Sequence, residues 1–174
     1  MSIPALRPFS LVGENRLITE ICSSKFYRFG FVYHEKFNQP QILRKLESLF
    51  GDKFVYIQQH TQFGIFCFID NIKVDFIHYP HLLIKPIESI DEVRFYSNED
   101  IAAMKIQAIL GRAQKKDFWD LFELLQHYSL QQIMDWHKLK YPGQMLAISI
   151  PHAITYFVDA EETEEPVSYK NQSW

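Results

Sequence analysis

The sequence has little cysteine, no long apolar run and no excess of positive charge. Its 174 residues include two cysteines, Cys22 and Cys67, which do not form a C-x-x-C pair, so a disulfide framework is excluded. No window approaches the ~18 uninterrupted apolar residues of a membrane span, and the chain does not open with a basic segment and an apolar signal core. The net charge of −3 gives no global positive field of the kind that indicates a nucleic-acid partner. We therefore expect a cytoplasmic protein that does not associate with a membrane.

Several common catalytic fingerprints are also missing. The sequence contains no G-x-S-x-G motif, no Walker-type loop and no dinucleotide-binding fingerprint. Apolar residues, by contrast, are plentiful: 47% of the residues are hydrophobic and 16% are aromatic, which is enough for a packed core. The length corresponds to one domain, or to one domain with a small additional helical part.

Short segments rich in β-branched and aromatic residues dominate the first half of the chain. They predict strands at residues 9–13, 27–34, 54–60, 63–70, 72–79 and 93–96. Asp70 and Asn71 separate two of these segments and predict a tight hairpin turn, since both residue types tolerate positive φ. Helical periodicity is present at residues 14–24 and 40–50. This order predicts an α+β fold, in which a mixed sheet is flanked by helices.

The second half of the chain is predominantly helical. Two helices are predicted between residues 97 and 125, followed by helices at 130–139 and 144–158, where Pro151 indicates a helix start or a kink. The acidic residues 159–165 are expected to form a solvated loop. We therefore divide the chain into an α/β core of residues 1–96, a helical part of residues 97–158 packed on it, and an acidic, irregular tail of residues 159–174.

The first helix of the pair has a clear start signal. Ser97, followed three residues later by Asp100, is typical of a capping box, and the acidic side chain suits the positive end of the helix dipole. Lys115 and Lys116 are expected to lie in the short turn between the two helices. They are interpreted as solvated lysines, although contact with a phosphate stays open.

Opposite charges recur at helical spacing along this pair. Lys105 and Arg112 share a partly apolar face of the first helix, and Asp117 and Asp120 share a face of the second. The two cations can therefore face the two carboxylates. Two interpretations remain open, a brace that only ties the helices together and a functional cluster, because ion pairs occur in both.

The pattern K-x-x-A-x-x-x-R-x-x-x-K-D-F-x-D-L, which runs from Lys105 to Leu121, resembles the nucleotidyltransferase AbiEii/AbiGii toxin family. Residues 72–79 are similar to that family's strand with a single acidic residue, and residues 9–13 are similar to the strand that leads into its Gly-rich turn. The likeness extends to about residue 141. It implies a minimal nucleotidyltransferase fold, similar to the polymerase-β superfamily, whose members transfer a nucleoside monophosphate from a triphosphate to an acceptor.

The resemblance also implies a set of site residues and partners. A Gly-rich turn would hold the triphosphate, strand carboxylates would hold Mg²⁺, and a helical Lys with a following Asp would complete the site. The implied catalytic residues are Lys105, Asp117 and Asp120, the implied nucleotide-binding residues are Gly13, Asn15, Lys105 and Arg112, and the implied metal ligand is Asp75. The implied partners are a nucleoside triphosphate and a protein partner or antitoxin, whereas an RNA acceptor gains no support from the net charge.

The N-terminal part departs from the family pattern. The Gly-rich turn reads Gly-Glu-Asn at residues 13–15, and the family's acidic pair falls on Arg28 and Gly30. No Asp or Glu lies between residues 23 and 34, so a shift of one or two residues does not restore the pair. Mg²⁺ prefers octahedral oxygen ligands, and Asp75 alone is a weak start for such a site. We expect Arg28 to attract Asp75 or a phosphate in place of the metal.

Three functions are consistent with these residues. The first is a catalytically degenerate nucleotidyltransferase-fold protein that binds a nucleotide, an anion or a partner. The second is an active Mg²⁺-dependent transferase, the toxin of a toxin–antitoxin pair, which moves a nucleoside monophosphate to RNA or protein and takes a further ligand from Glu14 or Glu35. The third is an interaction module. The position of Arg28 relative to Asp75 and Lys105 would discriminate between the first two.

Overall fold

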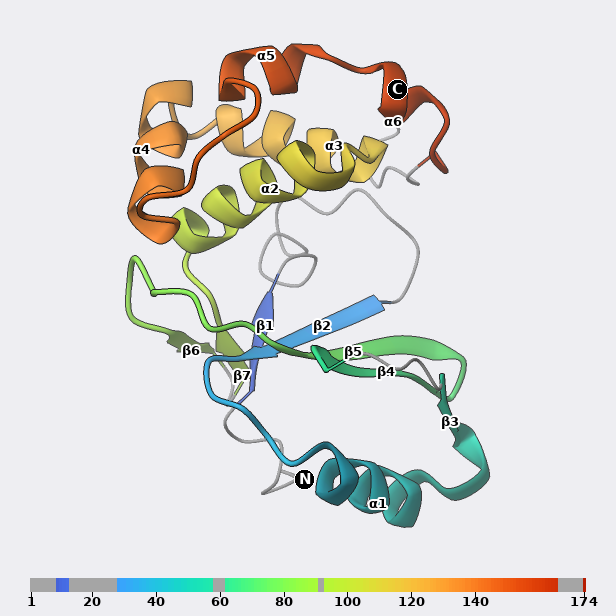
Figure 1. Ribbon diagram of the computed structural model, residues 1–174. Coiled ribbons are helices and arrows are strands. Elements are labelled where there is room, and N and C mark those ends of the chain that lie inside the picture. Colours follow the sequence, from blue (N-terminus) through green and yellow to red (C-terminus); the bar gives the residue numbers. More distant parts are fainter. Residues whose placement is uncertain (1–8, 13–27, 58–61, 91–92, 166–173) are drawn as a thin grey trace. The chain divides into compact units, whose positions relative to one another are not determined.

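The computed structural model describes residues 9–12, 28–57, 62–90, 93–165 and 174 (Figure 1). By the contacts within the chain, these residues divide into two compact units. The first unit contains the strands and one helix, and the second contains residues 82–86 and everything from residue 96 onward. The helix predicted over residues 14–24 lies outside the described residues. No helix of the described part is long and apolar enough to cross a membrane.

The first unit is built on a seven-stranded mixed sheet with the order β3-β4-β5-β2-β1-β7-β6. The strands are β1 (Ser10–Val12), β2 (Arg28–Tyr33), β3 (Phe54–Tyr56), β4 (Gly64–Ile69), β5 (Ile72–His78), β6 (Glu88–Ile90) and β7 (Val93–Phe95). Two neighbouring pairs, β2 with β5 and β1 with β7, are parallel, and the remaining pairs are antiparallel. The predicted α+β class and mixed sheet are therefore confirmed.

The hairpin between β4 and β5 follows directly from its two turn residues. Asp70 has a φ of 53° and Asn71 a φ of 65°, the left-handed conformation that these residue types tolerate. Ile69 and Ile72 pair across the turn, so the two-residue connection fixes the register of the whole hairpin. The predicted turn is confirmed.

Helix α1 (Gln39–Phe50) covers one face of this sheet (Figure 1). It begins at Asn38, whose side chain accepts a hydrogen bond from the backbone N–H of Gln41 at 3.1 Å, and it ends at Gly51, where φ is 50°. A short 3₁₀ helix, η3 (Gly51–Lys53), follows. The fully buried members of the core between the helix and the sheet are Phe9, Ile42, Leu46, Ile65, Cys67, Val74 and Phe76.

Cys67 lies inside this core and is expected to be chemically inert in the folded protein. Burial, and secondarily the charge of Asp75, raises the pKa of the Cys67 thiol to about 12. Because only the thiolate reacts, a Cys22→Ser variant, in which Cys67 is the single thiol, should react with a disulfide reagent at pH 8 at least about a thousandfold more slowly when folded than in denaturant. A spectrophotometric assay of thiol release measures both rates, and equal rates would contradict the placement of Cys67 in the core.

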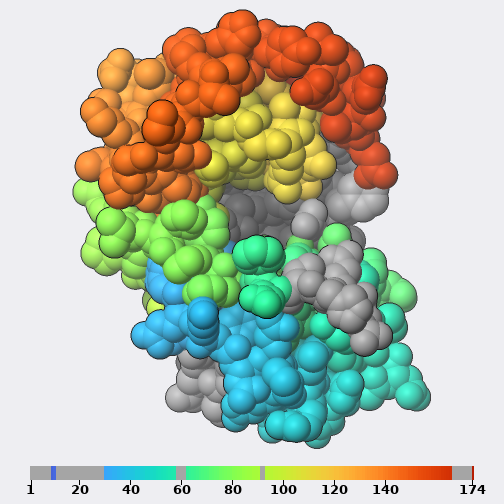
Figure 2. Space-filling model, viewed as in Figure 1, coloured from blue at the N-terminus to red at the C-terminus, as the bar shows by residue number. Residues whose placement is uncertain are grey.

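The second unit is helical. Its helices are α2 (Asn98–Arg112), α3 (Lys115–Leu125), α4 (Leu130–Lys140), α5 (Ile150–Thr155) and α6 (Val158–Glu161). Helix α2 is central, since it contacts α3, α4 and α5. The space-filling view shows the segment from α5 to α6 (orange to red) curving along the yellow atoms of the helix pair (Figure 2). Apolar side chains from all five helices form one core, which includes Ala102, Ile106, Ile109, Leu121, Leu124, Ile133, Ala153 and Ala160.

The helical unit differs from the prediction in three places. The single helix predicted over residues 144–158 is wrong, because the chain forms a helix only from Ile150 and the backbone becomes extended at Tyr156. Pro151 lies in the first turn of α5, where its missing N–H needs no partner, so it marks a start and not a kink. Residues 159–161 belong to α6 and not to a loop. Lys115 and Lys116 form the first turn of α3 and do not lie in the preceding turn.

The start of α2 is capped as predicted, but Asp100 has a different role. The hydroxyl of Ser97 accepts a hydrogen bond from the Asp100 N–H at 3.1 Å. The Asp100 carboxylate accepts hydrogen bonds from the Ser97 hydroxyl at 2.7 Å, from the Ile84 N–H at 3.0 Å and from the Lys85 N–H at 3.2 Å. Asp100 therefore ties the segment of residues 82–86 to the first turn of α2.

A buried lysine completes this arrangement. The ammonium of Lys140, on the last turn of α4, lies 2.6 Å from the Asp100 carboxylate and donates to the Leu82 carbonyl at 2.9 Å. Both charged side chains are 0% exposed. Burial lowers the pKa of Lys140, and Asp100 opposes this shift by favouring the charged form. The ring of Tyr96 adds a contact with the ammonium, 5.2 Å from its centroid.

Candidate functional site

The structure brings the predicted charges of α2 and α3 together. Arg112, in the last turn of α2, donates from Nε and from Nη2 to the two carboxylate oxygens of Asp117, each at 2.9 Å. This is a bidentate pair, the geometry that matches a guanidinium to a carboxylate. The Asp117 side chain is 0% exposed, whereas the Arg112 side chain is 46% exposed. The pair thus has one end inside the helical unit and the other in water.

Lys105 lies on the same helix, α2, seven residues before Arg112, and it contacts both carboxylates. Its ammonium is 3.9 Å from Asp117 Oδ1 and is in closer contact with Asp120 Oδ2. The predicted contact between the two cations and the two carboxylates is therefore confirmed. The ion-pair cluster of Lys105, Arg112, Asp117 and Asp120 has no net formal charge.

The environment of the ion-pair cluster shifts two pKa values. The hydrogen bonds that Arg112 donates to the Asp117 carboxylate are the largest cause that raises the pKa of Arg112, so this side chain stays charged at any physiological pH. Burial raises the pKa of Asp120 above its ordinary value, although the charge of Lys105 pulls it in the opposite direction. Burial and the Lys105 cation therefore have opposite effects on the pKa of Asp120.

The turn between α2 and α3 aligns Arg112 with Asp117. Ala113 ends α2 in the left-handed conformation, with φ 44° and ψ 54°, and its N–H donates to the Ala108 carbonyl at 3.3 Å. Glycine is the residue usually found at this position, because a Cβ disfavours the left-handed region. The chain therefore stores a small backbone strain directly beside the ion-pair cluster.

Replacement of Ala113 by Gly is expected to relieve this strain. The Ala113→Gly variant should gain about 0.5–1 kcal/mol in free energy of unfolding, since the relieved left-handed strain exceeds the entropy cost of a glycine. Urea denaturation followed by circular dichroism measures the change. Ala108→Gly is the matched control, because Ala108 lies inside α2, where glycine should cost about 1 kcal/mol. A loss of stability in Ala113→Gly would contradict the prediction.

Asp75, the predicted metal ligand, lies in the middle of β5. It alternates with Val74 and Phe76 of the core, so it occupies the face of the sheet opposite to α1. It is buried, and its lateral partners are Gly30 on β2 and Phe66 on β4. Neither partner has a side-chain oxygen. Among the described residues there is also no group of three or more His, Cys, Asp or Glu that could hold a metal ion.

The remaining predicted residues are not all described. Gly13 and Asn15 lie outside the described residues. The backbone of Arg28 pairs with Lys73 in the parallel register of β2 and β5, but its side chain is outside the description, so its expected contact with Asp75 stays a prediction. Asp75 belongs to the first unit and the ion-pair cluster to the second.

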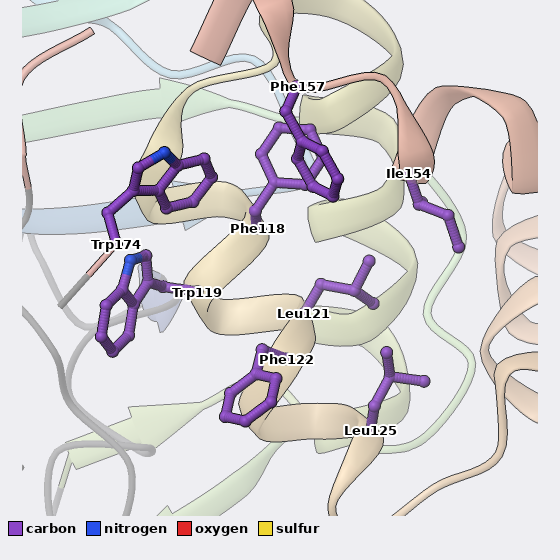
Figure 3. A pocket seen from close by; sticks show the side chains of 8 residues that line it. All are labelled: Phe118, Trp119, Leu121, Phe122, Leu125, Ile154, Phe157 and Trp174. Carbon is purple, nitrogen blue, oxygen red and sulfur yellow. The ribbon is translucent and has the colours of Figure 1, made fainter. Parts of the chain in front are cut away.

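Two features of the helical unit were not predicted from the sequence. One is the buried pair of Lys140 and Asp100, whose partners are far apart in the chain. The other is an apolar groove along α3, shown in Figure 3. A signal for the groove was present, because Phe118, Phe122 and Leu125 recur at helical spacing beside Leu121 and Leu124. Helix α3 is therefore apolar on two faces. It can bury only one of them against α2, and the other lines the groove.

The architecture corresponds to that of nucleotidyltransferases. The polyadenylate synthase of Megavirus is similar to this chain with a TM-score of 0.50 and 15% sequence identity, over 71% of this chain and 29% of that one. JHP933 from Helicobacter pylori aligns over 86% of this chain and 81% of its own, with a TM-score of 0.49 and 14% identity. The first likeness supports a nucleotidyltransferase-like fold, and the fold alone.

The sequence comparisons are more specific. Residues 27–142 match the family described as nucleotidyl transferase AbiEii toxin, type IV TA system. This is more than half of the chain, which therefore belongs to the AbiEii nucleotidyltransferase toxin family. An uncharacterized protein of Aquifex aeolicus is 31% identical over 137 residues, which are 76% of this chain. The chain spans 65% of the length of that relative.

Proposed function

We propose that this family member keeps the nucleotidyltransferase fold but does not carry out metal-dependent nucleotidyl transfer, and acts instead by binding a nucleotide or another anion, or a protein partner. The observation that carries this proposal is the pair of strand neighbours of Asp75. A two-carboxylate metal site needs a second acidic side chain beside it, and the register supplies Gly30 and Phe66. The family's membership of a type IV toxin–antitoxin system makes an antitoxin the class of partner that we propose.

The ion-pair cluster supports a binding role better than a catalytic one. Lys105 lies between two carboxylates, so its charge is already compensated before a triphosphate arrives. Arg112 uses two N–H donors toward Asp117, but a guanidinium has five. Its side chain is 46% exposed, so the remaining donors can contact a phosphate from the solvent side. Arg112 is therefore the residue of the cluster that we propose as the anion contact.

The prediction for activity is an absence of transfer. With Mg²⁺ and each of the four NTPs labelled at the α-phosphate, the full chain should label RNA, protein and itself no more than an Asp75→Asn variant does. The reason is that the strand neighbours of Asp75 are Gly30 and Phe66, and neither offers a second carboxylate to hold the ion between enzyme and triphosphate. Gel autoradiography measures the label, and circular dichroism establishes that both proteins are folded.

A second measurement separates binding from chemistry. Calorimetry of the same NTPs without Mg²⁺ should detect binding that an Arg112→Met variant weakens. Label transfer by the wild type that Asp75→Asn abolishes would overturn the proposal in favour of the active transferase. In that alternative, Glu14 or Glu35 provides the missing metal ligand.

A further inference from the structure

A small pocket of about 200 Å³ lies at the end of α2 and includes Arg112 in its lining. The last turn of α2 and the residue that ends it, residues 109–113, provide one part of this lining. The other part comes from the segment between the loop before α5 and the first turn of α6, namely from Ile148, Ala153, Tyr156 and Asp159. All of these residues belong to the helical unit, so the pocket is a feature of that unit alone.

Two opposite charges line this pocket without pairing with each other. Among the described residues, the guanidinium of Arg112 is hydrogen-bonded to Asp117, through two of its five N–H groups, and to no other side chain. The carboxylate of Asp159 is exposed and has no hydrogen-bond or ion-pair partner in the part of the chain that the structure describes. A ligand that carries a negative and a positive group would contact both side chains at once.

The end of α2 adds partial negative charge to the pocket. The carbonyl groups in the last turn of an α-helix have no N–H partner within the helix. Here the N–H of Ala113 donates to the Ala108 carbonyl at 3.3 Å, and Ala108 precedes the residues that line the pocket. The negative end of the helix dipole therefore lies at the pocket and, with Asp159, favours a cationic group.

The remaining lining is largely apolar, and it limits the size of the ligand. Ile109 and Ala153 are buried, whereas Ile148 is 43% and Tyr156 45% exposed, so the pocket has an apolar base and a rim that solvent reaches. Its volume is below the roughly 300 Å³ at which sites for drug-sized molecules begin. The ligand is therefore a small molecule that has one short apolar group beside its two charges.

We propose that this pocket binds a free α-amino acid with an apolar side chain. Its carboxylate would take the free donors of Arg112, its ammonium would lie by Asp159 and the end of α2, and its side chain would contact Ile109 and Ala153. The proposal rests on the function proposed above, because it takes Arg112 as an anion contact, and it names that anion as the carboxylate of a zwitterion.

Leucine is a suitable probe, because leucinamide lacks its carboxylate and N-acetylleucine lacks its ammonium. In ¹H–¹⁵N NMR titrations of the full chain near neutral pH, leucine should shift backbone signals of residues 109–113 and 148–159 in a saturable way. Each analogue should bind about tenfold more weakly or worse, since it leaves one charge of the pocket without a partner. Unmoved signals with leucine, or equal affinities for leucine and both analogues, would overturn the proposal.

Two variants test the two charges separately. Arg112→Met and Asp159→Asn should each weaken leucine binding by about tenfold or more, and Asp159→Asn should do so without loss of stability, because this carboxylate is exposed. Glu162→Gln is the matched control, since Glu162 is exposed on the same segment but does not line the pocket, and it should change nothing. Equal affinities of Asp159→Asn and Glu162→Gln would contradict the assignment.

The nucleotide experiments separate this inference from the function on which it rests. Nucleotide binding that Arg112→Met weakens, together with no response to leucine, would overturn the inference and leave the proposed function in place. Label transfer that Asp75→Asn abolishes would overturn the proposed function, whereas saturable leucine shifts that require Arg112 and Asp159 would still support the pocket.

Discussion

Replacement of Lys140 by Met is expected to lower the free energy of unfolding by about 3–5 kcal/mol. The ammonium of Lys140 and the carboxylate of Asp100 are both fully buried, 2.6 Å apart. Methionine fills the space of the lysine stem but leaves the carboxylate in the interior without its cation. The hydrogen bonds from Ser97 and from the backbone of residues 84 and 85 remain, but they compensate only part of a buried charge. Thermal and urea denaturation followed by circular dichroism measure the loss.

The same helix offers a matched control for this variant. Lys138 is exposed on α4, so Lys138→Met should change the free energy of unfolding by no more than about 0.5 kcal/mol. The double variant Asp100→Asn/Lys140→Met should be more stable than Lys140→Met alone, because the asparagine oxygen still accepts the backbone N–H groups and no charge is left buried. The assignment would be wrong if Lys140→Met and Lys138→Met had the same stability.

The second large effect is expected at Asp117. Asp117→Asn should lower the free energy of unfolding by about 2–3 kcal/mol, because one asparagine oxygen cannot replace the two that accept from Arg112, and the amide N–H₂ then faces other donors. The loss is smaller than for Lys140, since the half-exposed Arg112 can return to water. Urea denaturation at neutral pH measures it.

Asp120 provides the comparison within the same cluster. Asp120 contacts Lys105 and not Arg112, so Asp120→Asn should lose only about 1 kcal/mol. This ranking distinguishes a brace built around the bidentate pair from a general attraction between two cations and two carboxylates. Equal losses in Asp117→Asn and Asp120→Asn would show that the bidentate geometry contributes nothing.

Local patterns in the sequence were sufficient for much of the fold. The turn at Asp70 and Asn71, the cap at Ser97 and the helices of the pair all depend on residues within a few positions of one another. Strand β6 was missed, because three exposed residues carry no alternation and form a strand only beside β7. The break between α5 and α6 was missed for a similar reason, since the apolar residues of this segment keep a helical spacing across it.

The site shows the same division between local and non-local information. Spacing alone predicted that Lys105 and Arg112 would meet Asp117 and Asp120, because both pairs lie on consecutive helices. Which cation pairs with which carboxylate depends on the left-handed turn at Ala113, which no pattern in the sequence specifies.

The interior pairing of Lys140 with Asp100 joins residues 40 positions apart. No local signal distinguishes Lys140 from the exposed Lys138 on the same helix. The burial of Lys140 and its pairing with Asp100 depend on how α2 and α4 pack, which only the structure specifies.

The order of the strands in the sheet has a consequence for how the chain is made. The β4–β5 hairpin joins neighbouring segments and can close on the scale of about 1–10 μs. Strand β2 must instead wait for β5 to form its parallel pair, and β1 pairs through Leu11 with Phe95 of β7. Such distant pairings form slowly, because a long loop has to close first. During synthesis, the edge of β1 that will meet β7 therefore stays exposed until the ribosome has released residue 95, and this is the period in which the nascent chain most needs protection from association with other chains.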